Sequence, residues 1–255
     1  MNKDKIQTAL KRHYEYLEHC GFKVLGVFLY GSQNYELDSE TSDVDTTGII
    51  VPTFDDLYKN TMISASYSFP HSKDKCNYKD IRNFFGLLKK SNPNILEALF
   101  TKYSIVNEKY TQLLERVFIN RELIARYDKD RYIASAFGMF TSFYKKLIKM
   151  STGDRQKELA EMLRLRELIK TYIVDELPYG EMLVPKKTAQ LRAIKFYDVK
   201  ISSTEIISIA EEAYNEVKEI VDKYSAARNS ENQKFIDELL YDVGYRIVSL
   251  EAINS

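Results

Sequence analysis

Several features that define common protein classes are scarce or absent in this sequence of 255 residues. Only two cysteines occur, Cys20 and Cys76, and no Cys-x-x-Cys pair, which argues against a disulfide framework and predicts a reducing, cytoplasmic setting. No apolar run reaches the ~18 residues that a membrane-spanning helix needs, so no membrane partner is expected. Nine glycines and five prolines are too few to indicate long disordered linkers.

Net charge and motif spacing exclude further classes. Lys+Arg and Asp+Glu both total 37, so the formal net charge is zero and gives no global attraction to nucleic acid, although a local basic patch stays open. His13, His19 and His71 have neither zinc-ligand nor catalytic-triad spacing. No Gly-x-x-x-x-Gly-Lys-[Ser/Thr] motif occurs, which excludes a P-loop kinase.

The hydrophobic periodicity divides the chain into two halves of different character. In the first half, strands are expected at 22–30 and 46–51, with weaker candidates at 63–69 and 76–78, and a helix at 80–89. In the second half, helical spacing dominates, and Ser202 and Glu205 have the spacing of a capping box. The helices expected there cover 131–150, 154–174, 188–196, 203–224 and 235–253. These patterns predict an α+β protein, with a small mixed-sheet lobe over 1–120 and an all-helical lobe over 121–255.

The most informative pattern is a pair of apolar stretches joined by polar residues. Residues 27–30 end in Gly31-Ser32, and a second apolar run begins with Asp43 and Asp45, one residue apart. On a strand, residues i and i+2 point to the same face, so the two carboxylates are expected to project together. They repel one another unless a cation lies between them, and hard oxygen ligands suit Mg²⁺. A Gly-Ser turn offers N–H groups to a phosphate, so the pattern predicts phosphoryl or nucleotidyl transfer.

Further motifs accompany this pair. They are Gly31-Ser32-Gln33-Asn34-Tyr35-Glu36-Leu37-Asp38, Thr41-Ser42-Asp43-Val44-Asp45, Lys79-Asp80-Ile81-Arg82, and Asn92-Pro93-Asn94-Ile95-Leu96-Glu97-Ala98-Leu99-Phe100-Thr101. The combination resembles the DNA polymerase β-like nucleotidyltransferase superfamily, and in particular the RlaP-type predicted nucleotidyltransferases of bacteria and large phages. The resemblance covers nearly the whole chain and is sharpest over residues 27–101.

The resemblance implies a set of site residues. Asp43 and Asp45 would bind Mg²⁺, and Gly31 and Ser32 would hold the β- and γ-phosphates of an NTP substrate. An acceptor hydroxyl would then attack the α-phosphate while pyrophosphate leaves. Three alternatives stay open for the acceptor: a nucleic-acid end, a protein or a small molecule. The sequence also leaves the oligomeric state open.

Four nearby residues have two interpretations each. Gln33 and Asn34 either contact the nucleotide or acceptor, or form a polar turn that positions Gly-Ser. Lys79 and Arg82 either neutralise phosphate charge or belong to a solvated helix start. Glu97 lies in an apolar helical stretch, where a carboxylate needs a partner, and a structural role that ties the sheet lobe to the helical lobe is favoured.

A third acidic residue, which relatives carry on a later strand, is replaced by Asn77 in this chain. An amide ligates a metal weakly and cannot act as a base at neutral pH. Asp74 would supply the carboxylate through a shifted register, or Asp80 would reach in, although a helix N-cap is the favoured role of Asp80. We expect Asn77 to lie on a strand that faces Asp43 and Asp45.

Two functional hypotheses follow from this substitution. The first is an active Mg²⁺-dependent nucleotidyltransferase. The second is a catalytically weakened relative that binds nucleotide, nucleic acid or a partner protein without turnover. A third carboxylate within reach of the metal would favour the first hypothesis, and its absence would favour the second.

Overall fold

The computed structural model describes residues 3–149, 154–224 and 230–252. Its internal contacts define two compact units, one of Met1–Asn34, Asp38–Asp128 and Asn229–Ser255, the other of Tyr35–Leu37 and Lys129–Arg228. The α+β class is confirmed, because the first unit contains a mixed sheet and the described part of the second unit contains only helices. The expected domains, 1–120 and 121–255, stay a prediction, because a division by internal contacts does not show which segments fold independently.

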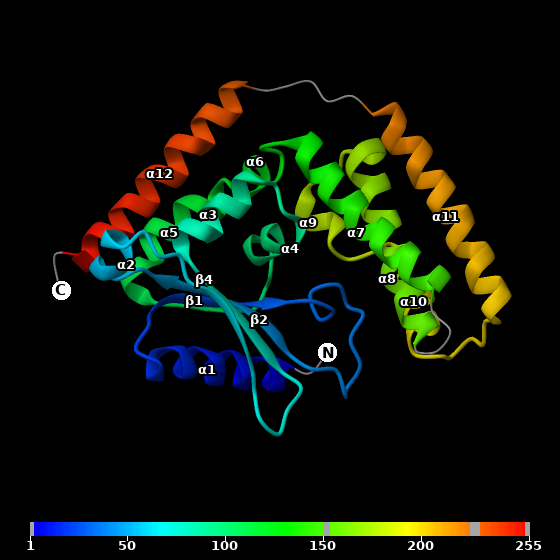
Figure 1. Cartoon of the computed structure of the whole chain (residues 1–255), viewed down its shortest axis with the longest axis horizontal. Helices are drawn as coiled ribbons and strands as arrows, with labels where there is room; N and C mark the ends of the chain where they lie inside the picture. Colours follow the sequence, from blue (N-terminus) through cyan, green and yellow to red (C-terminus); the bar gives the residue numbers. More distant parts are fainter. Residues whose placement is uncertain (1–2, 150–153, 225–229, 253–255) are drawn as a thin grey trace. The chain divides into compact units, whose positions relative to one another are not determined.

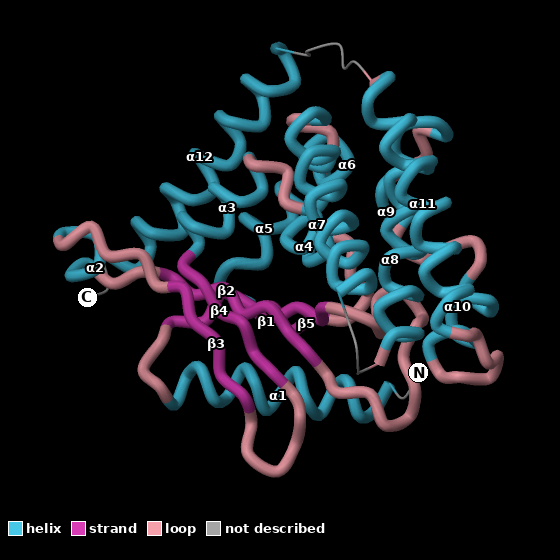
Figure 2. The backbone as a smooth tube through the Cα atoms, turned by 45° about the vertical axis from the view of Figure 1, so that its right-hand side comes forward, coloured by secondary structure: helices cyan, strands magenta, loops and turns pink. Residues whose placement is uncertain are grey.

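One mixed sheet of five strands forms the centre of the first unit (Figure 2). The strands are β1 (Lys23–Tyr30), β2 (Asp45–Val51), β3 (Ser64–Ser68), β4 (Lys75–Asp80) and β5 (Ser104–Val106), in the order β3-β4-β2-β1-β5. Strand β2 is antiparallel to β1 and parallel to β4. The prediction that residues 22–30 and 43–51 form neighbouring strands is therefore confirmed. The edge strand β5 is too short to show an alternating pattern in the sequence.

Helix α1 (Lys3–His19) lies along one face of the sheet (Figure 1). Its Leu10 and Leu17 are fully buried, as helical spacing of the apolar residues requires. A Cβ added to Gly48 of β2 would lie 2.7 Å from Cδ1 of Leu17, so only glycine lets the helix approach this closely. Gly21 adopts a φ of +83° just after the helix, a left-handed conformation that is common where helices end.

The other face of the sheet is partly covered by helices that include α3 (Ile81–Lys89) and α12 (Ser230–Ala252), which also pack on one another (Figure 1). Although α12 comes last in the sequence, it belongs to the first unit. Its Glu251 accepts hydrogen bonds from Lys109 and from Tyr110 Oη, and pairs with Lys23. The remaining helices of this unit are α2 (Phe54–Tyr58), α4 (Pro93–Leu96), η1 (Glu97–Leu99), η2 (Glu108–Tyr110), α5 (Thr111–Ile119) and α6 (Arg121–Ala125).

The second unit is built from helices, and side-chain caps begin two of them in the described part of the chain. Ser202 and Glu205 form the predicted capping box at the start of α11, and the Asp154 side chain accepts from Lys157 N at the start of α8. The helices are α7 (Lys129–Lys149), α8 (Arg155–Lys170), the π-helical turn η3 (Thr171–Asp175), α9 (Tyr179–Met182), α10 (Thr188–Lys195) and α11 (Ser203–Lys223). Across the described ranges, no helix combines the length and apolarity that crossing a membrane requires.

Several basic side chains of this unit form ion pairs with its acidic residues. Arg164 and Lys195 both pair with Glu161, and Arg166 and Lys170 both pair with Glu216. The pairing agrees with the zero net charge of the sequence.

Candidate functional site

The Gly-Ser turn follows directly after β1. Gly31 has a φ of +91°, a conformation that glycine adopts without the strain of a side chain. Its N–H donates to Glu97 Oε1 at 2.8 Å and is therefore not the phosphate donor that the sequence predicts. The N–H and hydroxyl of Ser32, in contrast, have no hydrogen-bond partner among the described residues. Ser32 is thus the member of the turn that is available to a phosphate oxygen.

Gln33 and Asn34 hold the turn in place. Gln33 is 6% exposed, and its amide donates to the backbone oxygen of Asp43 at 2.5 Å, which links the turn to the aspartate loop. The Asn34 amide donates to Leu29 O and Glu97 Oε1, and its carbonyl accepts from Thr101. Both side chains are engaged within the protein, which favours the positioning interpretation over nucleotide contact.

Glu97 has a structural role inside the first unit, whereas the tie between the sheet lobe and the helical lobe that the sequence favours stays a prediction. Its side chain is 1% exposed and accepts from Gly31 and Asn34. The two N–H donors therefore satisfy the buried carboxylate of Glu97. In return, the carboxylate fixes the Gly-Ser turn against η1.

The two aspartates lie on either side of the fully buried Val44. Asp43 is exposed in the loop before β2, and Asp45 is half-buried as the first residue of that strand. Burial, and next the negative charge of Asp43, raise the pKa of Asp45 to about 6. A group whose pKa is raised by a neighbouring carboxylate gains from a cation placed between the two.

Asp74 holds the backbone between these aspartates. It is 6% exposed, its Oδ1 accepts from Val44 N at 2.7 Å, and its Oδ2 accepts from Arg12. Protein donors therefore occupy both oxygens of Asp74. This arrangement favours a positioning role for Asp74 over the metal-ligand role expected from a shifted register.

Asn77 lies on β4, as expected, and shares a face of the sheet with Asp45. In the parallel pairing of β2 with β4, however, Asn77 pairs with Thr47, and the residue directly beside Asp45 is Lys75. Asn77 is therefore a diagonal neighbour of Asp45, about 7–8 Å away by sheet geometry. Its side-chain amide has no hydrogen-bond partner among the described residues.

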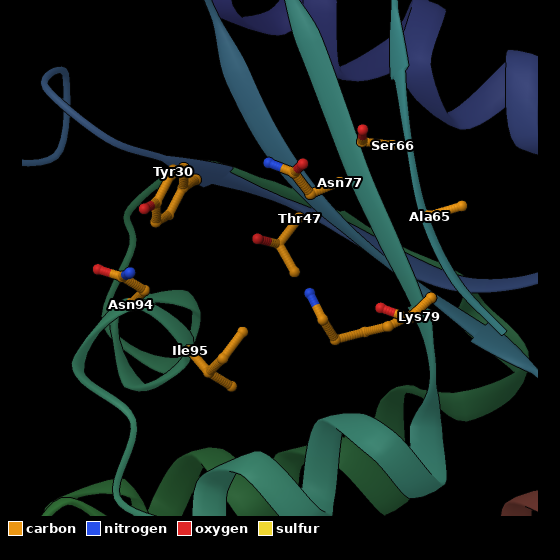
Figure 3. Close-up of a pocket in the computed structure, with 9 residues that line it drawn as sticks. Tyr30, Thr47, Ala65, Ser66, Asn77, Lys79, Asn94 and Ile95 are labelled. Atoms are coloured by element: carbon orange, nitrogen blue, oxygen red, sulfur yellow. The ribbon is translucent and has the colours of Figure 1, made fainter. Parts of the chain in front are cut away.

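Lys79 and Arg82 share the same two interpretations in the sequence, but their side chains have different surroundings in the structure. Lys79 is 8% exposed and lines a pocket of about 370 Å³ on the face of the sheet opposite α1 (Figure 3). Arg82 binds both carboxylate oxygens of Asp80 and the backbone oxygen of Thr61. Asp80 accepts from Arg82 N at 2.7 Å, so its predicted role as the N-cap of α3 is confirmed.

Polar residues that the sequence analysis did not select line the same pocket. They are Tyr30 from β1, Thr47 from β2, Ser64 and Ser66 from β3, and Asn94 from α4. Figure 3 shows the side chains of Thr47, Asn77 and Lys79 gathered on one side of the sheet. The alternation of polar residues at 75, 77 and 79 is the sequence signal that indicates this polar face.

The donor set fits a single hard cation. Asp43 and Asp45 offer carboxylate oxygens in a loop that Gln33 links to the Gly-Ser turn, and Mg²⁺ is usually held by one or two carboxylates together with substrate phosphates. In the described part of the chain, no group of three or more His, Cys, Asp or Glu side chains is arranged to hold a metal ion. The residues therefore fit a cation that arrives with a triphosphate, and do not fit a site that needs a third protein carboxylate.

Comparison with known proteins gives one family. The model of a family described as the RNA repair pathway DNA polymerase beta family, RlaP, matches residues 2–173. The match contains the whole sheet and the Gly-Ser and Asp-x-Asp elements, and it ends in η3 of the second unit. No curated protein matches the chain.

Proposed function

The chain belongs to the RlaP family of polymerase β-like nucleotidyltransferases, and from this membership we propose that it transfers a nucleoside monophosphate from an NTP to an acceptor hydroxyl with the help of Mg²⁺. One observation carries the proposal. The carboxylates of Asp43 and Asp45 flank a buried residue, and Gln33 links their loop to the turn that presents Ser32. Metal ligands and a phosphate donor are thereby held together.

Each residue has a part in the proposed reaction. Ser32 donates to the triphosphate through its N–H and hydroxyl, and Asp43 and Asp45 hold the cation. Mg²⁺ supplies charge neutralisation of the triphosphate and lowers the pKa of the acceptor hydroxyl. The acceptor oxygen forms a bond to the α-phosphorus, the bond to the bridging oxygen breaks, and pyrophosphate leaves with the electron pair. The hydroxyl proton passes to solvent, since Asp74, the further carboxylate near the aspartate pair, already accepts from Val44 N and Arg12.

We propose an RNA end as the acceptor. The family is described by an RNA repair pathway, which favours RNA over a protein or a small molecule. The roles proposed for Asp43, Asp45 and Ser32 do not depend on whether the acceptor is RNA.

A second candidate is a weakened relative that binds Mg²⁺ and NTP with little turnover. The position of Asn77 favours it, because the family resemblance implies a carboxylate there and both oxygens of Asp74 already accept from protein donors. Loss of a general base typically lowers a rate by about 10²–10⁴-fold. Slow transfer with intact nucleotide binding would therefore distinguish this candidate from the first.

A radiolabel-transfer assay with each of the four NTPs and a short RNA that ends in a 3′ hydroxyl tests the proposal. The wild type should transfer label, and the double variant Asp43→Asn, Asp45→Asn should not. Asp55→Asn, at an exposed aspartate of the same unit, is the matched control and should behave as wild type. Calorimetry of Mg²⁺–NTP binding completes the test. Unchanged affinity in the double variant would show that the aspartates are not the metal site.

A further inference from the structure

Lys79 has a largely buried side chain whose ammonium group opens onto a pocket and has no counter-ion among the described residues. Its side chain is 8% exposed, and it has no hydrogen bond or ion pair with any described residue. Burial lowers the pKa of Lys79, because the charged form loses hydration. An unpaired buried charge is costly, so such a lysine gains when an anion enters beside it.

The surroundings of Lys79 are suited to an anion. Thr47, Ser66 and Asn77 line the same pocket, and their side chains have no hydrogen-bond partner among the described residues. No Asp or Glu belongs to the described lining of the pocket. Two hydroxyls, an amide and an ammonium around a cavity of about 370 Å³ can all donate to the oxygens of one phosphate group.

The pocket is adjacent to the aspartate pair but separate from it. Thr47 lies two residues beyond Asp45 on β2, which is about 7 Å along a strand. Neither Asp43 nor Ser32 lines the pocket. A triphosphate held by Ser32 and the aspartates therefore leaves this pocket to a different phosphate.

We propose that the pocket binds a phosphodiester group of the acceptor strand, with Lys79 as its counter-ion and Asn77 and Thr47 as hydrogen-bond donors. The identification of the anion as part of the acceptor rests on the function proposed above. Binding of the strand here would place its terminal hydroxyl toward the α-phosphate of the nucleotide at Asp45.

The first test measures RNA binding without nucleotide or metal. The probe is a single-stranded RNA of about ten nucleotides with a 5′ fluorescein and a free 3′ hydroxyl, titrated in EDTA and followed by fluorescence anisotropy. Lys79→Met should weaken binding about ten- to hundred-fold, as expected for the loss of a hydrogen bond to a charged group. The slope of log K against log salt should fall by about 0.7, the value for one phosphate contact on a single strand.

Two controls separate this role from a structural one. Lys59→Met, at an exposed lysine of the same unit, should leave both the affinity and the salt slope unchanged. Lys79→Met should melt at or above the wild-type temperature, because it replaces a buried charge by an apolar side chain of similar length. If Lys79→Met does not fold, NMR of ¹³C-dimethylated wild-type lysines replaces it. The pKa of Lys79 should then rise when the RNA is added.

Each outcome bears on the inference. It is overturned if the wild type does not bind the RNA, if Lys79→Met binds it with unchanged affinity and slope, or if the lysine resonance does not respond. It is also overturned if Lys79→Met weakens Mg²⁺–NTP binding and spares RNA, since the pocket would then serve the nucleotide. If RNA binding depends on Lys79 while wild-type protein transfers no label, the inference stands and the proposed transferase function fails.

Discussion

On the face of the sheet that α1 covers, the side chains of His13, Thr46 and Asp74 have hydrogen-bond partners within the protein. His13 Nδ1 shares a hydrogen bond of 2.8 Å with Thr46 Oγ1, and Asp74 is held by Arg12 and Val44 N. On the opposite face, Asn77 and Lys79 have no such partners among the described residues. Since protein partners do not occupy the polar groups of Asn77 and Lys79, this opposite, open face is the one available to a ligand.

The two faces also respond to acid in opposite ways. Burial lowers the pKa of His13 to about 4, whereas burial and the Asp43 charge raise the pKa of Asp45 to about 6. As the pH falls from about 6 to about 4, the contribution of His13 to the free energy of unfolding decreases, because the imidazole is protonated in the unfolded state and stays neutral in the folded state. Over the same pH range, the contribution of Asp45 increases, because protonation removes the unfavourable charge of its carboxylate in the folded state.

The largest expected effect is the loss of Asp74 on the α1 face. Asp74→Ala leaves the Val44 N–H unpaired and removes the partner of Arg12, so we expect the free energy of unfolding to fall by about 3–4 kcal/mol. Urea titration at neutral pH measures the change. Asp55→Ala, at an exposed aspartate, should change it by less than about 0.5 kcal/mol. Equal effects of the two substitutions would contradict the structural role of Asp74.

The next effect is the acid response of His13. Its folded pKa of about 4 lies below the ordinary value of 6.5, so the stabilisation is complete above about pH 6.5 and is lost as the pH falls toward 4. We expect a loss of about 2–3 kcal/mol across this window. Replacement by a residue that does not titrate, His13→Gln, should flatten the dependence of unfolding free energy on pH. A variant with the same steep dependence as wild type would assign the acid response to another group.

A smaller effect is expected from restoring an acid on the open face. Asn77→Asp should raise the transfer rate by about ten- to hundred-fold if the missing carboxylate limits turnover. The new carboxylate also faces Lys79, so the acceptor KM should rise. Lys75→Asp is the matched comparison, because Lys75 pairs directly with Asp45. Activation by Lys75→Asp alone would place the missing acid beside Asp45, and activation by neither would favour the binding-only relative.

The smallest effect concerns Asp45 in metal-free protein. Its raised pKa means that the ionised form is disfavoured in the folded state, so stability is lost as the pH rises from about 4 through about 6. Asp45→Asn should therefore be more stable than wild type at pH 7, by about 1–2 kcal/mol, and no more stable at pH 4. Thermal unfolding in EDTA at the two pH values measures the difference. Saturating Mg²⁺ and NTP should reverse it, because only the wild type gains the ligands.

Local pattern was sufficient for much of this protein. The apolar runs of 22–30 and 46–51, the Ser202 capping box and the Asp80 cap each depend on neighbours a few residues away, and all are present in the structure. The Gly31-Ser32 and Asp43-Val44-Asp45 elements, together with the motifs at 79–82 and 92–101, were sufficient to identify the family. Periodicity and caps are readable in a sequence because the physical forces behind them act within a few residues.

Tertiary structure decided which polar residues have partners. Lys79 and Arg82 lie three residues apart and have the same charge, yet the turn from β4 into α3 pairs Arg82 with Asp80 and leaves Lys79 facing a pocket. The contact of Gly31 with Glu97, 66 residues away, likewise depends on packing between distant segments. The placement of α12 in the first unit follows the same rule. These contacts depend on which distant segments pack against one another, and local sequence patterns do not contain that information.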